Sequence, residues 1–260
     1  MLSYQHMYHA GCLADVHKHL CLSVILNKMA ENNKAMSYIE THAGRGIYDL
    51  SSAEAKKTGE AEVGICKILA QKKLHSSHPY HRVIAQVRAQ NNVNYYPGSP
   101  YIAKSFLRAQ DKLHLMELHP KEFEFLKRNI KGKNITIHKC DGYSGALSAL
   151  ATKVNRGIVL IDPSYEIKSE YDQAADFIKN LHRQKPEISI LLWYPILSTN
   201  LHYSMCKLLT HAKLSNFWQQ EVFFKTDDVK RAIGSGLIAV NLTTETTKEL
   251  DKDAKDIFTP

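Results

Sequence analysis

The stretch Gly157-Ile-Val-Leu-Ile-Asp-Pro-Ser-Tyr-Glu166 places an acid and a proline directly after a short, uncharged apolar run. An apolar run without alternating polar residues is typical of a strand buried on both faces of a parallel sheet. Polar residues at the end of such a strand lie at the carboxyl edge, where open α/β sheets bind ligands. The stretch therefore predicts an α/β fold with a functional site at Asp162.

Similar short apolar runs alternate with amphipathic segments along the rest of the chain. We expect strands at 36–40, 112–117, 135–139, 157–161, 188–193, 217–224 and 236–241. We expect helices at 14–31, 100–108, 120–129, 142–151, 170–184 and 201–213. This alternation predicts a Rossmann-like, mostly parallel sheet with helices on both faces and an antiparallel last strand. We expect the polar tail, 243–260, to form a frayed helix.

The interval between Gly46 and Lys112 is too long for a plain strand–helix–strand unit, which needs only about 30 residues. Helical patterns at 58–71 and 79–91 predict a small helical subdomain inserted into the sheet domain. We therefore divide the chain into three parts. They are 1–50 (the N-terminal helix and the first part of the sheet domain), 51–98 (the inserted helical, basic subdomain) and 99–260 (the remainder of the sheet domain).

The charge of the chain is positive and unevenly distributed. Lys and Arg number 34 against 26 Asp and Glu, and no acid occurs from Val63 to Gln110. Seven cations lie in that stretch: Lys67, Lys72, Lys73, Arg82, Arg88, Lys104 and Arg108. A segment of one sign suits a polyanion, because neutralised phosphates release counterions. The insertion is thus predicted to face nucleic acid, with a merely solvated basic surface as the alternative.

Composition excludes several other classes of protein. The 260 residues are 44% hydrophobic and 23% charged, which is a globular and not a disordered profile. No apolar run reaches the roughly 18–20 residues of a membrane span, and the first residues lack the pattern of a secretory signal. The five cysteines form no C-x-x-C pair, which indicates reduced thiols. We expect a cytoplasmic monomer without a membrane partner.

Strand-end acids and glycines form a series along the chain. Gly44 and Gly46 follow the first predicted strand, where missing side chains let the backbone approach a ligand, although a tight structural turn is the alternative. Glu117 lies where doubly wound folds hydrogen-bond ribose hydroxyls. Asp141, next to Gly142, could accept a hydrogen bond from an adenine amino group. Glu117 could instead cap a helix or be a surface group.

The fourth position of this series carries the chemistry. An exocyclic amine is a poor nucleophile because its lone pair is delocalised into the ring. Its reaction needs an acceptor for an N–H proton, a carbonyl that fixes its orientation and an aromatic face against the base. Asp162, the Pro163 carbonyl and Tyr165 supply these three groups in that order. Proline also stiffens the turn that orients the carbonyl.

This order of motifs resembles the class I S-adenosylmethionine-dependent methyltransferases that act on adenine N6 through an Asp-Pro-Pro-Tyr loop. It resembles most closely the RlmJ family of large-subunit ribosomal RNA methyltransferases. The matching segments cover most of the chain: Met1-Leu-Ser-Tyr4, His9-Ala-Gly11, Ala14-Asp15, Lys18-His19, Thr41-His-Ala-Gly44, Thr58-Gly-Glu60, Tyr95-Tyr-Pro-Gly-Ser-Pro100, Glu117-Leu-His-Pro120, Asp141-Gly142, Leu160-Ile-Asp-Pro163, Tyr165-Glu166 and Trp193-Tyr-Pro195.

The resemblance implies a role for individual residues. Contacts to the methyl donor, S-adenosylmethionine, are implied at His19, His42, Ser99, Glu117, Asp141 and Gly142, and the glycine turn adds Gly44. Asp162 is implied as the proton acceptor that also lines the donor pocket, and Tyr4 as a contact to the target adenosine. The implied partner is large-subunit RNA free of ribosomal proteins. Ser164 departs from the family loop, and we expect activity to persist, at a reduced rate.

Alternative functions remain open at this point. The same fold could methylate adenine N6 in DNA, or the chain could be a non-catalytic nucleic-acid-binding protein involved in the use of external DNA. A NAD-linked oxidoreductase is disfavoured because Asp49 stands where the third fingerprint glycine would fall. Histidine spacings such as that of His6 and His9 could suit a metal. No cysteine or acid completes a plausible set, so we predict no metal.

Overall fold

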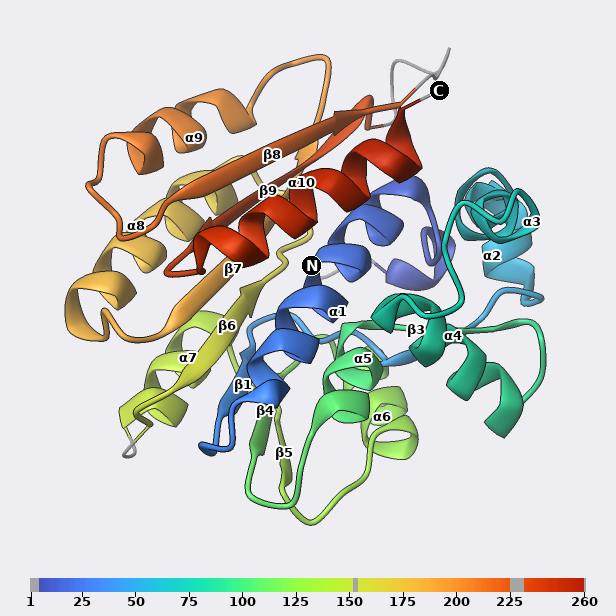
Figure 1. The fold of residues 1–260 in the computed structure, drawn as a ribbon, viewed down its shortest axis with the longest axis horizontal. Helices are drawn as coiled ribbons and strands as arrows, with labels where there is room; N and C mark the ends of the chain where they lie inside the picture. Colours follow the sequence, from blue (N-terminus) through green and yellow to red (C-terminus); the bar gives the residue numbers. More distant parts are fainter. Residues whose placement is uncertain (1–4, 152–153, 225–231, 260) are drawn as a thin grey trace.

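The computed structural model describes residues 5–151, 154–224 and 232–259, which form a central sheet covered by helices (Figure 1). The sheet has seven strands in the order β5-β4-β1-β6-β7-β9-β8. Their bounds are β1 Ser37–Glu40, β4 Lys112–Met116, β5 Ile135–His138, β6 Gly157–Ile161, β7 Ser189–Ile196, β8 Trp218–Phe223 and β9 Gly234–Val240. Neighbouring strands are parallel except that β9 is antiparallel to both β7 and β8. The predicted Rossmann-like sheet with a reversed last strand is therefore confirmed.

The strand that begins the decisive stretch lies in the middle of the sheet. All five residues of β6 are buried, and β6 pairs with β1 on one side and β7 on the other. A Cβ atom at Gly157 would lie 2.3 Å from the carbonyl oxygen of Ser37 on β1, so only glycine allows this approach. Central position explains why β6 lacks the alternation of a half-exposed strand. Its carboxyl end delivers Asp162 directly to the edge of the sheet.

Helices cover both faces of the sheet. The α-helices are α1 Leu13–Glu31, α2 Ala53–Thr58, α3 Lys67–Ala70, α4 Pro79–Gln90, α5 Ser99–Phe106, α6 Pro120–Asn129, α7 Gly142–Ala151, α8 Ser169–Gln184, α9 His202–Thr210 and α10 Thr244–Phe258. Side chains of α1, α4, α5, α6 and α10 share one hydrophobic cluster, and those of α7, α8 and α9 share a second on the opposite face. Figure 1 shows α1 and α10 side by side across one face.

The inserted segment is bracketed by a small antiparallel ribbon, in which β2 (Ile47–Asp49) pairs with β3 (Tyr95–Pro97). The single helix expected at 58–71 is wrong. Helix α2 ends at Gly59, whose φ of 65° is left-handed, and a π-helical turn, Glu62–Cys66, precedes α3. Insertion side chains such as Ile65 join the cluster that also contains α1. The division of the chain at residues 50 and 98 stays a prediction.

The polar tail is not a frayed helix, so that expectation is also wrong. Helix α10 buries Leu250, Ala254 and Ile257, which are spaced four and three residues apart, and it packs against α1. The hydroxyl of Thr243 caps its first turn by accepting a hydrogen bond from the amide of Thr246 at 3.2 Å. Four-residue apolar spacing in a polar background is the signature of an amphipathic helix. No helix in the described part of the chain is long and apolar enough to cross a membrane.

Candidate active site

A cavity of about 930 Å³ opens at the carboxyl edge of the sheet, which is where this kind of fold binds ligands. Ten of the predicted site residues line it: His19, His42, Gly44, Ser99, Glu117, Asp141, Gly142, Asp162, Pro163 and Tyr165. They come from α1, from the loops after β1, β4, β5 and β6, and from the first residues of α5 and α7. The predicted Tyr4 lies outside the described residues. Segments far apart in sequence thus contribute to a single site.

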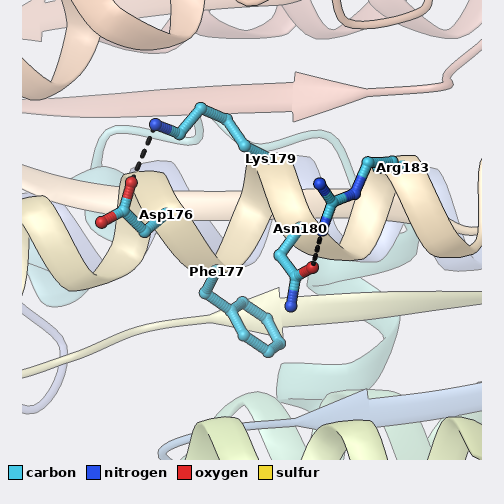
Figure 2. A pocket seen from close by; sticks show the side chains of 5 residues that line it. All are labelled: Asp176, Phe177, Lys179, Asn180 and Arg183. Atoms are coloured by element: carbon cyan, nitrogen blue, oxygen red, sulfur yellow. Dashed lines mark hydrogen bonds and ion pairs between the residues drawn. The ribbon is translucent and has the colours of Figure 1, made fainter.

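A second, smaller hollow lies on the surface of α8 and holds no predicted site residue (Figure 2). Its polar groups are satisfied within the helix. The Lys179 ammonium lies 2.8 Å from a carboxylate oxygen of Asp176, and the Arg183 guanidinium donates to the Asn180 side-chain oxygen at 2.9 Å. Such contacts three residues apart are ordinary on a solvated helix surface. The cavity at the sheet edge is therefore the candidate active site.

The floor of the cavity is formed where α7 meets the end of β1. A Cβ atom at Gly142 would lie only 2.0 Å from the carbonyl oxygen of Thr41, so glycine permits the close approach of these two segments. The Thr41 hydroxyl is 2.8 Å from Nδ1 of His42, whose ring meets Tyr143 edge-on at 5.6 Å. Burial lowers the pKa of His42 to about 4, so the imidazole is neutral near pH 7.

The carboxylate of Glu117 is held by two main-chain amides. Gly44 donates to one oxygen and His119 to the other, each at 2.7 Å. The left-handed φ of Gly44, 60°, turns its amide toward this carboxylate. Burial raises the pKa of Glu117. A carboxylate has about four acceptor positions, so two remain for the hydroxyl groups of a ligand.

Asp141 has a second role that was not predicted from the sequence. One of its carboxylate oxygens accepts a hydrogen bond from the amide of Ser144 at 2.9 Å, which is the geometry of an N-terminal helix cap. The carboxylate is also exposed and lines the cavity. Capping α7 therefore orients this acid at the cavity wall without using all of its acceptor capacity.

Lys18, for which no role was predicted, contacts the predicted proton acceptor Asp162. The Lys18 Nζ lies 2.5 Å from Oδ2 of Asp162 and 3.1 Å from Oδ1 of Asp15. Burial opposes the ammonium charge, but Asp162 and Asp15 together raise the pKa of Lys18 above its ordinary value. The other oxygen of Asp15 accepts from the Gly11 amide at 3.0 Å and lies 2.8 Å from Nε2 of His6. A lysine three residues after an acid on an apolar helix was the available signal.

A buried carboxyl group, that of Glu40, contacts the site residue Ser99. Glu40, at the end of β1, is completely buried, and the hydroxyls of Ser99 and Tyr38 donate to its two oxygens at 2.5 Å and 2.9 Å. Burial raises the pKa of Glu40 to about 8, so the group is mainly uncharged near pH 7. Glu40 was not predicted as a site residue, because its burial and its contact with Ser99, 59 residues away, arise only in the folded chain.

The imidazole of His19, which lines the cavity, is also uncharged near pH 7. Its Nδ1 lies 2.8 Å from the hydroxyl of Tyr96, which in turn lies 2.7 Å from the hydroxyl of Tyr80. Burial lowers the pKa of His19 to about 3. The insertion therefore reaches the predicted donor contact through a chain of aromatic hydroxyl groups.

Tyr165, the aromatic residue of the Asp-Pro-Ser-Tyr loop, is held in place by contacts that the sequence does not reveal. Tyr165 has a φ of 56°, and its hydroxyl donates to the carbonyl oxygen of Trp193 at 2.9 Å. The Tyr165 ring packs 4.3 Å from the ring of Tyr171 and is only 8% exposed. Trp193 also lines the cavity, and the Lys18 ammonium lies 5.6 Å from its ring centroid. That Tyr165 stacks against a base stays a prediction.

Among the described residues, no group of three or more His, Cys, Asp or Glu side chains could hold a metal ion. The strand order, the reversed last strand and the cavity lined by strand-end acids define the fold of a class I methyltransferase. The METTL16 methyltransferase domain has this fold too, with a TM-score of 0.50 over 87% of this chain and 81% of that one, at 9% identity.

Comparison with known sequences identifies the family. Residues 33–258 match the model described as "Ribosomal RNA large subunit methyltransferase D, RlmJ". The chain is 35% identical over 244 residues to ribosomal RNA large subunit methyltransferase J of Escherichia coli strain K12, and 36% identical over 248 residues to that of Haemophilus influenzae. Both alignments cover 93% of this chain and 87% of the relative. The chain belongs to this family of ribosomal RNA methyltransferases, so the predicted family and enzyme class are confirmed.

A solved structure of a similar protein matches the fold of nearly the whole chain. Protein LPL1258 of Legionella pneumophila is 33% identical to this chain and matches it with a TM-score of 0.85. The match covers 97% of this chain and 95% of that protein. A solved structure of similar sequence therefore shares the fold over nearly all of this chain.

Proposed function

We propose that this protein transfers a methyl group from S-adenosylmethionine to the N6 amino group of an adenine in large-subunit ribosomal RNA. The observation that carries the proposal is the position of Asp162 and Pro163. They follow the buried strand β6 and share one cavity with Glu117 and the Asp141-Gly142 turn. Membership in a ribosomal RNA methyltransferase family supports the reaction class and the substrate class.

The cavity suits a nucleoside-containing donor. Its volume of about 930 Å³ falls in the range of pockets that enclose drug-sized ligands, roughly 300–1,000 Å³. Glu117 retains acceptor positions for ribose hydroxyls, and Gly142 lets α7 approach the end of β1 closely enough for both segments to line the cavity. S-adenosylmethionine supplies an electrophilic methyl group on sulfur. The residues of the chain bind it, orient it and exclude water.

The adenine amine would be activated by orientation and by acceptance of its protons. Asp162 has one oxygen in an ion pair with Lys18, which leaves the other oxygen to accept an N–H bond. The Pro163 carbonyl accepts the second N–H bond, and these two bonds direct the nitrogen lone pair away from the ring plane. Tyr165 and Trp193 provide the aromatic wall of an extruded base. No covalent intermediate is needed.

We further infer that the RNA is free of ribosomal proteins and that the enzyme acts as a cytoplasmic monomer. The net charge of +8 favours association with a polyanion. Within the acid-free stretch, Lys67 lies on the cavity wall, so the insertion reaches the place where RNA would enter.

The experiment that tests the proposal identifies the methylated nucleoside. Purified protein and labelled S-adenosylmethionine are incubated with protein-free large-subunit RNA and, in parallel, with duplex DNA. Nucleosides are then separated and weighed by mass spectrometry. We expect N6-methyladenosine in the RNA reaction only. If only the DNA were methylated, the substrate would be DNA and not ribosomal RNA. If calorimetry showed no binding of S-adenosylmethionine, methyl transfer would be rejected in favour of a non-catalytic binding role.

A further inference from the structure

A second basic surface lies outside the acid-free stretch, on helix α6 and on the segments just before and just after strand β5. Residues 121–139 contain six Lys and Arg residues but only two acids, Glu122 and Glu124. We define the α6 surface as one partly exposed aromatic residue and five exposed cations: Phe123, Lys127, Arg128, Lys131, Lys133 and Lys139. Glu122 is buried in an ion pair with Arg45, so it does not neutralise this surface.

The cations of the acid-free stretch are less available by comparison. The Lys73 ammonium donates to main-chain oxygens of Ile257 and Thr259 at the end of α10. Arg82 donates to the side chain of Asn27. Arg108 is held by the carboxylate of Asp111 and by three main-chain carbonyl groups. Part of the positive charge that the sequence attributed to RNA binding therefore stabilises the fold.

The α6 surface begins at the mouth of the candidate active site. Leu118, His119 and Glu122, at the start of α6, all line the cavity. Leu118 is 47% exposed, which leaves an apolar side chain at this rim. The ten residues of α6 span about 15 Å at 1.5 Å per residue. Figure 1 shows α6 beside the β4–β5 end of the sheet.

Two of the cations lie close to the one aromatic ring of this surface. The ammonium groups of Lys127 and Lys139 lie 5.1 Å and 5.6 Å from the ring centroid of Phe123. Lys127 also lies 3.5 Å from Glu124, but both side chains are about half exposed, so this pair is weak. Lys139 precedes Asp141 by two residues and thus connects the surface to the cavity wall.

We propose that the α6 surface binds the phosphodiester backbone of the RNA that flanks the target adenine, with Phe123 available to stack on a neighbouring base. The proposal rests on the proposed function, because it places a second part of the same RNA. Exposed cations in a row neutralise successive phosphates, and aromatic rings among them accept unpaired bases. The target nucleotide enters the cavity, and the chain beyond it follows α6.

The experiment measures RNA binding as a function of salt, with no methyl donor present. The triple variant Lys127→Gln, Lys131→Gln, Lys139→Gln is compared with the wild type on a protein-free large-subunit RNA fragment. Its matched control is Lys207→Gln, Lys248→Gln, Lys252→Gln, which removes three exposed helical lysines from α9 and α10. Circular dichroism melting confirms that each variant is folded.

We expect the α6 variant to lose at least tenfold in RNA affinity near 0.15 M salt. Its slope of log affinity against log salt should become shallower by about two to three, since each lost phosphate contact contributes roughly 0.7–0.9. The control triple should keep the wild-type slope. A charge-conserving triple, with arginine at the same three α6 positions, should also keep it, which separates charge from a structural role of the lysine stems.

Equal affinities and slopes for the α6 triple and the control triple would overturn the proposal. A shallower slope of log affinity against log salt in the arginine triple would also overturn it. Because binding is measured without donor, a wild type that binds RNA but fails to methylate it rejects the proposed function separately. Steady-state kinetics gives a second readout: loss of a flanking contact should raise KM and leave kcat unchanged.

Discussion

The ammonium group of Lys18 lies 2.5 Å from the carboxylate of Asp162, although 144 residues separate the two in sequence. The lysine comes from α1 and the acid from the loop after β6, so this contact ties the N-terminal helix to the predicted proton acceptor. Lys18 is 3% exposed and also contacts Asp15. A charge this deeply buried is tolerated because two carboxylates compensate it.

Lys18→Gln is expected to damage both stability and activity. It leaves the carboxylates of Asp15 and Asp162 without their cation, and breaking a buried pair costs about 3–5 kcal/mol. The free energy of unfolding, measured by urea titration, should fall by roughly that amount. Methyl transfer should fall about 100-fold or more, because the orientation of Asp162 is lost.

A double-mutant cycle provides the control for this prediction. In Lys18→Gln combined with Asp162→Asn, part of the lost stability should return, because one unpaired charge is removed, while activity stays low. Lys28→Gln, on the same helix but partly exposed and paired with Glu245, should cost about 1 kcal/mol or less. Additive losses in the double variant would contradict the coupling that the distance indicates.

Glu40→Gln should change how stability depends on pH. The pKa of Glu40 is raised to about 8 from an ordinary value of 4.5, so between these values the folded protein keeps a proton that the unfolded chain releases. The wild type should therefore lose stability relative to the Gln variant as the pH rises from about 4.5 to 8, by at most about 1.4 kcal/mol per pH unit. Below and above this window the difference should be constant.

The measurement is the free energy of unfolding of both proteins at intervals from pH 4 to pH 9. Gln can keep a hydrogen bond with Ser99 and Tyr38, so the variant should fold. Parallel stability curves for the two proteins across the whole range would show that Glu40 does not titrate as its burial implies.

Gly142→Ala should destroy the close contact between α7 and the end of β1. Its new Cβ atom would lie 2.0 Å from the Thr41 carbonyl oxygen, which is main chain and cannot move aside like a flexible side chain. We expect a loss of about 2 kcal/mol or more in stability, the scale of an overpacked core, and a loss of donor affinity measured by calorimetry. Ser148→Ala, at an exposed position of the same helix, is the control and should change neither quantity. Wild-type donor affinity in Gly142→Ala would contradict the predicted role of this turn.

Much of the site was predictable because its residues follow strands. In a parallel sheet the carboxyl ends of neighbouring strands meet at one edge, so Glu117, Asp141 and Asp162 had to lie near one another once their strands were recognised. The apolar run of β6 was the clearest of these signals, since a strand buried on both faces shows no alternation.

Other features depend on contacts that the sequence does not display. Lys18 and Asp162 meet only after α1 packs across the sheet, and Glu40 is recognisable only through its burial beneath Ser99. The helix expected at 58–71 is interrupted at Gly64, whose ψ of −116° is not helical. Gly64 packs so closely against Gly11 that a Cβ atom at Gly64 would lie 2.1 Å from the Gly11 carbonyl oxygen. Local helix periodicity cannot register such a tertiary constraint. Helix α10, in contrast, was expected but only as a frayed helix, although the apolar spacing that lets it pack was visible in the sequence.

The most direct test of the account compares Asp162→Asn with the wild type on protein-free large-subunit RNA. Asp172→Asn, exposed on α8, is the matched control. N6-methyladenosine is quantified by mass spectrometry, and donor affinity is measured by calorimetry. We predict that Asp162→Asn forms the product about 100-fold more slowly or worse, while donor affinity changes less than tenfold and the control behaves as the wild type. Formation of N6-methyladenosine by Asp162→Asn at the wild-type rate would contradict the central role of this carboxylate.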